Sequence, residues 1–115
     1  MNDLITILNN LREGKVTRAD DVINEKVVVE MTMPTGEKVE VIVNLDNAYI
    51  LYALEADRKL EARVQIKVNG VRILYQPVRD KDEKHELNRF IQDMGDRLHR
   101  SENINAQHYY KLLTR

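Results

Sequence analysis

Two stretches of alternating apolar and polar residues, about 25–45 and 61–78, constrain the fold of this chain more than any other feature. Each stretch is interrupted once, the first by Pro34-Thr35-Gly36 and the second by Asn69-Gly70. Alternation with a period of two is typical of half-buried strands. Proline followed by glycine favours a three-residue hairpin loop, and Asn-Gly is the preferred two-residue hairpin turn. The sequence therefore predicts two antiparallel hairpins.

The turns also predict a register for each hairpin, because the length of a loop decides which residues face one another. In the first hairpin the expected partners are Met31 with Val39, Val29 with Val41 and Val27 with Val43. In the second hairpin they are Val68 with Val71, Ile66 with Ile73 and Val64 with Tyr75. We therefore expect a four-stranded antiparallel sheet with one apolar face.

An N-terminal helix is predicted between Asp3, which is placed to cap it, and Gly14, which is placed to end it. Its apolar positions follow the i, i+3, i+4, i+7 spacing of a one-faced helix: Leu4, Ile7, Leu8 and Leu11. Thr17 with Asp20 three residues later resembles a capping pair. We therefore expect a short helical turn over residues 18–23.

Residues 47–60, between the hairpins, predict a central helix that Asp46 can cap. Its first two turns are apolar on nearly all sides, which is typical of a helix that is deeply buried or pressed against another chain. An edge strand over residues 48–54 is the alternative, because tyrosine and isoleucine favour strands. Good helix formers over residues 55–60 favour the helix.

Two C-terminal helices are predicted after the second hairpin. Asp80 and Glu83 form a capping pair. An apolar stripe follows them: Leu87, Phe90, Ile91, Met94 and Leu98. Ser101 is expected to help end this helix, and residues 105–113 to form a short final one. The expected fold is a single α+β domain over residues 1–115, with the four-stranded sheet flanked by N-terminal, central and two C-terminal helices.

The composition excludes several classes of protein. With 43% hydrophobic and 32% charged residues and a formal net charge of -1, the chain is neither disordered nor strongly basic. It has no cysteine, which excludes disulfides, thiol catalysis and cysteine-ligated metal sites. No apolar run approaches the roughly 20 residues that span a bilayer, and no secretory signal is visible. We expect a cytoplasmic protein that does not bind a membrane.

Catalytic motifs, metal ligands and cofactor-binding loops are not apparent in the sequence. Ser101 is the only serine, and the four glycines are isolated, so no phosphate-binding loop can form. Asp82, His85 and Glu86 can share a helix face and hold a metal ion weakly. Solvated charges on the polar side of a helix explain these three residues better. We expect no enzymatic activity, no metal and no cofactor.

Surplus apolar residues indicate a first candidate surface, because apolar groups left over after the core is filled often mark an interface. The candidates belong to the outer face of the sheet and to the central helix: Val28, Ile42, Leu74, Tyr49, Ile50, Leu51, Tyr52 and Leu54. The alternative is that helices cover both faces of the sheet and bury them. As an interface, this set predicts a protein partner and a homo-oligomer.

Basic residues indicate a second candidate surface, suited to a phosphate backbone with tyrosines available for stacking. The candidates are Arg63, Lys67, Arg72, Arg97, Arg100, Tyr109, Tyr110 and Lys111. The pI of about 6.3 argues against this function, since nucleic-acid-binding modules usually have a marked basic excess. The alternative is a solvated sheet face whose charges discourage edge pairing.

The leading hypothesis is a small non-catalytic intracellular binding protein, an adaptor, inhibitor or regulator that acts through protein–protein contacts. The alternative is a nucleic-acid-binding regulator that uses the basic sheet face and the C-terminal helices. A third and less favoured hypothesis is an enzyme or ligand sensor. Its site would be assembled from dispersed residues such as His85, His108, Tyr49 and Arg72.

Overall fold

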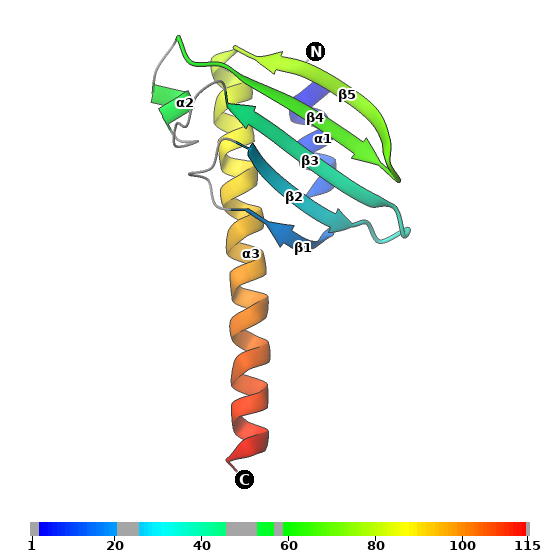
Figure 1. Cartoon of the computed structure of the whole chain (residues 1–115), viewed down its shortest axis with the longest axis vertical. Coiled ribbons are helices and arrows are strands. Elements are labelled where there is room, and N and C mark those ends of the chain that lie inside the picture. Colours follow the sequence, from blue (N-terminus) through cyan, green and yellow to red (C-terminus); the bar gives the residue numbers. More distant parts are fainter. Residues whose placement is uncertain (1–2, 21–25, 46–52, 57–58, 115) are drawn as a thin grey trace.

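The computed structural model describes residues 3–20, 26–45, 53–56 and 59–114. The side chains of Ala53, Glu55, residues 101–110 and Leu112 lie outside that description. The described residues form two layers, a sheet in front and helices behind it (Figure 1).

The sheet has five antiparallel strands in the order β1-β2-β3-β4-β5, so each strand pairs with its neighbours in the sequence. The strands are β1 (Lys15–Ala19), β2 (Lys26–Thr32), β3 (Lys38–Leu45), β4 (Ala62–Val68) and β5 (Val71–Val78). Strands β2 to β5 are the two predicted hairpins. The prediction of a four-stranded sheet is wrong, because β1 adds a fifth strand at the edge.

Strand β1 lies where the sequence predicts a helical turn over residues 18–23. Thr17 does not cap a helix: its hydroxyl donates to the carbonyl of Glu30 in β2 at 3.3 Å. The Asp20 carboxylate accepts a hydrogen bond from the backbone N–H of Val28 at 3.2 Å. Both side chains therefore bind the backbone of a neighbouring strand, which is the competing use of such residues. The remaining residues of that prediction, 21–23, lie outside the described residues.

The first hairpin has the predicted register. Its pairs include Val27 with Val43, Val29 with Val41 and Met31 with Val39. Gly36 has a φ of 101°, a conformation that glycine adopts without steric strain, and its N–H donates to the carbonyl of Met33 at 2.8 Å. Turn chemistry and apolar pattern therefore agree in this hairpin.

The second hairpin has the predicted register only beside its Asn-Gly turn. Further along, Ile66 pairs with Leu74 and not with Ile73, so Ile73 is the extra residue of a β-bulge. A shift by one residue exchanges the two faces of a strand. Leu74 therefore packs against the core, whereas Tyr75 is 50% exposed. The predicted pairs Ile66 with Ile73 and Val64 with Tyr75 are wrong for this reason.

The turn of the second hairpin is fixed to the first hairpin by one residue. Asn69 and Gly70 have φ values of 50° and 82°, as a type I′ turn requires. The backbone N–H of Asn69 donates to the carbonyl of Lys38 at 2.8 Å. Its side-chain oxygen accepts from the N–H of Lys38 at 3.0 Å. The β4–β5 turn is therefore tied to the start of β3.

Two short helices complete the helical layer together with the long C-terminal one. Helix α1 (Asp3–Leu11) buries the face that its spacing predicts, with Leu4, Leu8 and Leu11 buried. Helix α2 (Ala53–Ala56) is the described helical part of the central segment predicted over 47–60. Residues 46–52 and 57–58 lie outside the described residues.

Helix α3 (Lys81–Leu113) begins as predicted, because the Asp80 carboxylate accepts hydrogen bonds from the N–H groups of Asp82 and Glu83. It continues without a break, so the prediction of two separate C-terminal helices is wrong. Serine and asparagine reduce helix stability by only some tenths of a kcal/mol each, too little to end the helix at Ser101. Its 33 residues span about 50 Å, and its C-terminal half extends past β1 (Figure 1).

One hydrophobic core lies between the sheet and the helices. Helix α3 contributes Leu87, Phe90, Ile91 and Met94, each at most 1% exposed. We call the sheet face that packs on α1 and α3 the inner face, and the opposite one the outer face. Val28 and Ile42 face outward by strand alternation, yet they are only 5% and 6% exposed.

Candidate functional site

The outer face of the sheet is not covered by any helix or strand in the described part of the chain (Figure 1). Side chains that lie opposite one another form a row across this face. We call it the charge row: Arg18, Glu30, Glu40, Lys67 and Arg72, one from each strand in order. From β1 to β5 it reads basic, acidic, acidic, basic, basic.

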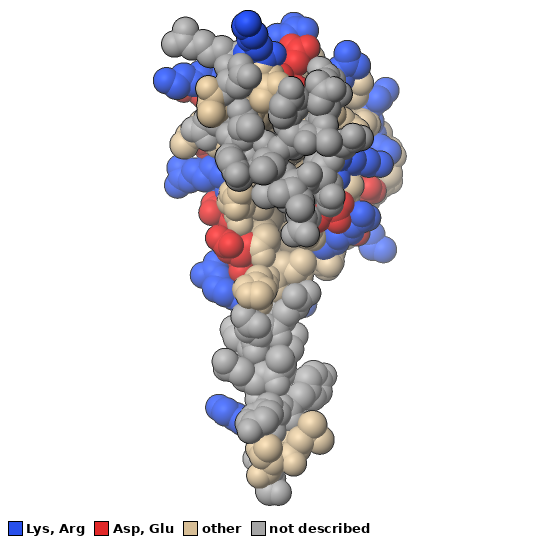
Figure 2. All heavy atoms as spheres, turned by 60° about the vertical axis from the view of Figure 1, so that its left-hand side comes forward, with Lys and Arg blue, Asp and Glu red and all other residues tan. Residues whose placement is uncertain are grey.

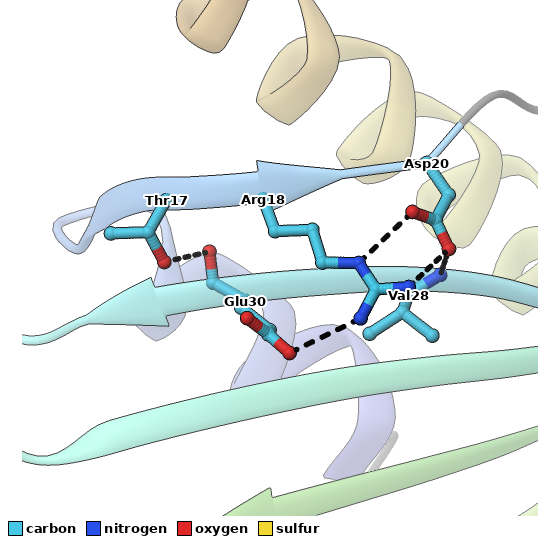
Figure 3. A network of polar contacts seen from close by, with 5 residues as sticks. All are labelled: Thr17, Arg18, Asp20, Val28 and Glu30. Atoms are coloured by element: carbon cyan, nitrogen blue, oxygen red, sulfur yellow. Dashed lines mark hydrogen bonds and ion pairs between the residues drawn. The ribbon is translucent and has the colours of Figure 1, made fainter.

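At the β1 end, polar contacts hold Arg18 on the sheet (Figure 3). Its Nε donates to the Asp20 carboxylate at 3.0 Å, and its Nη1 donates to the Glu30 carboxylate at 3.4 Å. These acceptors, Asp20 before Glu30, raise the pKa of Arg18 above its ordinary value. The Glu30 carboxylate therefore has Arg18 as its partner on the β1 side. On the β3 side, Glu30 lies opposite Glu40.

Two pairs within the charge row place like charges opposite one another. Glu30 faces Glu40 across β2 and β3, and Lys67 faces Arg72 across β4 and β5. Like charges in direct register destabilise an antiparallel pair. We call Glu30 and Glu40 the acidic half of the row, and Lys67 and Arg72 its basic half. Opposite charges also meet within the chain, where Glu30 lies beside Arg18 and Glu40 beside Lys67.

An open groove of about 410 Å³ lies beside the acidic half of the charge row. It is lined by Thr17, Glu30, Met31, Thr32, Lys38, Val39 and Glu40. Small-molecule sites are usually concave and mostly apolar with a few convergent polar groups. This lining is mainly charged and hydroxylated and lies on an open sheet, so the groove has the character of a surface depression.

Strand β5 exposes three large apolar side chains, which we call the β5 strip: Val71, Ile73 and Tyr75, at 65%, 54% and 50% exposure. The guanidinium carbon of Arg72 lies 4.7 Å from the centroid of the Tyr75 ring, within cation–π distance. The bulge produces this arrangement, because the unbulged register places Ile73 and Tyr75 toward the core.

Both edge strands carry features that oppose pairing with a further strand. The register of β1 shifts between Val16 and Arg18, and that of β5 shifts at its bulge. Strand β5 also contains Pro77, which has no backbone N–H. Bulges and prolines protect exposed sheet edges. These features oppose the addition of a further strand at either edge of the sheet.

The predicted protein-interface residues do not form one exposed patch among the described residues. Leu54 is fully buried in the core, and Leu74 packs against it. The prediction that Leu74 faces outward is wrong, because the bulge turns it inward. Val28 and Ile42 face outward but are buried. The others lie outside the described residues: Tyr49, Ile50, Leu51 and Tyr52.

The predicted nucleic-acid-binding residues fall on two separate surfaces. The outer face carries Arg63, Lys67 and Arg72. Helix α3, behind the sheet, carries Arg97, Arg100 and Lys111. Arg97 is also engaged within the fold, since it donates to the carbonyl of Arg12. The side chains of Tyr109 and Tyr110 lie outside the described residues.

On the face of the molecule that Figure 2 shows, the charges of the described residues do not gather into a field of one sign. In the view of Figure 2, basic and acidic side chains are interspersed over the body of the molecule. On the outer face, Glu40 lies directly beside Lys67. Among the described residues, the expected basic surface is therefore limited to the β4–β5 half of the sheet.

In residues 3–20, 26–45, 53–56 and 59–114, no three histidine, aspartate or glutamate side chains are placed to hold a metal ion. Hydrogen bonds from Thr35 and Arg79 lower the pKa values of Glu37 and Glu61, which are surface groups. His85 is exposed on α3 and Arg72 on β5, in different layers of the molecule. In the same residues, no helix is long and apolar enough to cross a membrane.

Comparisons with protein-family models, with curated proteins and with solved structures found no match. Sequence reasoning missed Tyr75 as an exposed residue because Asn-Gly predicts a hairpin without a bulge. The run Ile73-Leu74-Tyr75 carries the available signal, since three consecutive apolar residues fit either face of a strand.

Proposed function

We propose that this protein is a non-catalytic binding protein that engages a protein partner through the outer face of its sheet. The contact surface consists of Ile73 and Tyr75 from the β5 strip and the basic half of the charge row; Val71 lies opposite Val68 and faces the other side of the sheet. In this role the protein acts as an adaptor, inhibitor or regulator.

The β5 strip is the observation that carries this proposal. Exposed apolar side chains grouped on one strand, with charged residues around them, are typical of interaction sites. Tyrosine and arginine are the residues most enriched among those that dominate binding energy. Tyr75 and Arg72 combine both types in one stacked pair.

The charge row supports the same surface in a different way. Charged side chains at an interface add more to the orientation and rate of association than to affinity. Lys67 and Arg72 beside the β5 strip therefore favour a partner surface that is apolar at its centre and acidic at its rim.

Affinity capture with variants tests the proposal. The tagged wild-type chain and the tagged Ile73→Ser/Tyr75→Ser variant are each used as bait in an extract of the native cell. An untagged copy of the wild-type chain is also present in each extract. We expect the variant to recover its specific partner at a level reduced by roughly tenfold or more, as for loss of hot-spot residues.

Leu113→Ser is the matched control, because Leu113 is 85% exposed and lies at the far end of α3. The control should capture the same proteins as the wild type. Equal recovery by wild type and by the Ile73→Ser/Tyr75→Ser variant, both folded by circular dichroism, would remove the β5 strip from the binding surface and contradict the proposal.

A nucleic-acid-binding regulator is the second candidate, favoured by one specific observation. Tyr75 lies on the same face as Arg63, Lys67 and Arg72. Aromatic rings among basic side chains on a sheet are used to stack single-stranded bases. This function predicts binding of a fluorescent single-stranded oligonucleotide that weakens steeply with salt and is lost in Tyr75→Leu. Absence of binding at low salt would eliminate it.

A further inference from the structure

We propose that a second copy of this chain is the partner of the outer face, and that the two sheets stack face to face about a two-fold axis. The axis lies in the plane between the sheets, runs parallel to the strands and passes between β3 and β4. This inference rests on the proposed function, because it assigns a partner to the same surface.

The order of charges in the charge row selects this arrangement. Rotation about that axis places β2 over β5 and β3 over β4 of the second copy. Glu30 then faces Arg72 of the second copy, and Glu40 faces Lys67 of the second copy. The two-fold axis repeats both pairs, so one row gives four pairs of opposite charge. Arg18 falls outside the overlap and keeps its contacts within its own chain.

Other ways of stacking the same faces are opposed by the same charges. An axis directly over β3 places Glu40 against Glu40 of the second copy. An axis along the row itself places every charge against its own copy. Like charges brought together in an interface disfavour an arrangement by several kcal/mol in measured complexes, so the row distinguishes one stacking from its alternatives.

The like-charged pairs inside each chain point to the same partner. Glu30 opposite Glu40 and Lys67 opposite Arg72 are unfavourable in an isolated sheet. In the stacked pair, each of these residues gains an opposite charge from the second copy. Two like-charged pairs of the single chain thus gain opposite charges in the dimer, and local conflicts of this kind are typical of functional surfaces.

The neighbouring rows are compatible with the same axis. The row nearest to the charge row on the outer face holds no charged residue: Val28, Ile42, Gln65 and Tyr75. The row after it holds Lys26, Asn44, Arg63 and Pro77. Under the rotation, Asn44 faces Arg63 of the second copy, and Pro77 faces Lys26 of the second copy. Neither contact brings like charges together. Stacked sheets lie about 10 Å apart, a gap that long charged side chains can fill from both sides.

Charge-swapped chains test this arrangement. The variant Lys67→Glu/Arg72→Glu has a row that is acidic in all four overlapping positions, and the variant Glu30→Lys/Glu40→Lys has one that is basic. We expect the wild-type chain to sediment as a dimer at low salt and to dissociate as salt rises, since screening weakens exposed charge pairs. Each variant alone should be monomeric, with a dissociation constant raised by roughly tenfold or more.

Mixing the two variants should restore a dimer that contains one copy of each. The chain with all four substitutions should form a dimer by itself. Lys81→Glu/Arg89→Glu is the control, because it makes the same change of net charge at exposed positions on α3. The control should remain dimeric. A monomeric wild-type chain at low salt, or swapped variants that dimerise like the wild type, would overturn the inference.

The test separates this inference from the proposed function. If the wild-type chain is monomeric and still captures another protein that Ile73→Ser/Tyr75→Ser loses, the second copy is excluded and the binding surface stands. If neither another protein nor a second copy binds the outer face, both proposals are overturned.

Discussion

The two hairpins of this protein start from equally clear sequence signals and end with different outcomes. The first keeps its predicted register from the turn to the end of both strands. The second keeps it beside Asn69-Gly70 and then gains one extra residue at Ile73. The comparison teaches that a turn sequence determines the pairing next to it, whereas a bulge further along decides which side chains reach the surface.

The difference between the hairpins also separates their roles. Both strands of the first hairpin are central in the sheet and bury their apolar side chains almost completely. Strand β5 of the second hairpin is an edge strand, and its bulge brings Tyr75 to the outer face. Both hairpins therefore contribute to the core, but only the irregular one also exposes large apolar side chains that belong to the candidate binding surface.

Alanine substitution at two isoleucines gives the largest expected effect and tests the comparison directly. Ile66 is fully buried and Ile73 is 54% exposed, although an unbulged hairpin makes them partners. Ile66→Ala should lower the free energy of unfolding by about 2–5 kcal/mol, as for other buried large-to-small changes. Ile73→Ala should lower it by less than about 1 kcal/mol. Equal losses in urea unfolding would contradict the bulge.

The contact between the hairpins gives an intermediate effect. Asn69→Gly keeps the positive φ of the turn and removes the side-chain acceptor for the N–H of Lys38. We expect a loss of about 1 kcal/mol in the free energy of unfolding, the usual contribution of one such hydrogen bond. Thr35→Gly, in the loop of the first hairpin, is the comparison variant because the Thr35 hydroxyl donates to the exposed side chain of Glu37 and not to the backbone of another strand. An equal or larger loss there would contradict the account.

The pH dependence of stability gives the smallest effect. The hydrogen bond from Arg79 lowers the pKa of Glu61 below its ordinary value of 4.5. A carboxyl group of this kind stabilises the folded chain above pH 4.5, and that contribution is lost as the pH falls through the lowered folded pKa. Glu61→Gln should therefore lower the urea midpoint slightly at neutral pH, and the difference from wild type should vanish in acid. A difference that grows on acidification would contradict this sign.

The sequence predicted those parts of the fold that depend on local signals. The first hairpin, the apolar faces of α1 and the first half of α3, and the Asp80 cap all follow from spacing and turn chemistry. Strand β1 was not predicted because Thr17 and Asp20 suit a helix cap as well as a bond to the neighbouring strand. The continuity of α3 was not predicted because serine and asparagine, which are only weak helix formers, were expected to end the helix near Ser101.

The candidate site was predictable only in part, for a related reason. Strand alternation correctly placed Arg63, Lys67 and Arg72 on one face. The alignment of Arg18 with Glu30 depends on a strand that pairs only in the folded sheet. The exposure of Tyr75 depends on the β-bulge. The apolar run Ile73-Leu74-Tyr75 is compatible with the register that contains the bulge and with the register that lacks it. Tertiary pairing, and not local propensity, determined these two features.

The orientation of β5 can be measured directly, because the chain contains no native cysteine. Single-cysteine variants Leu74→Cys and Tyr75→Cys are labelled with a maleimide at high salt, where charge-paired copies separate. The account predicts rapid labelling at position 75 and slow labelling at position 74, where the side chain packs against the core. Rapid labelling at 74 with protection at 75 would contradict it, since that pattern belongs to a hairpin without the bulge and leaves the proposed surface without its tyrosine.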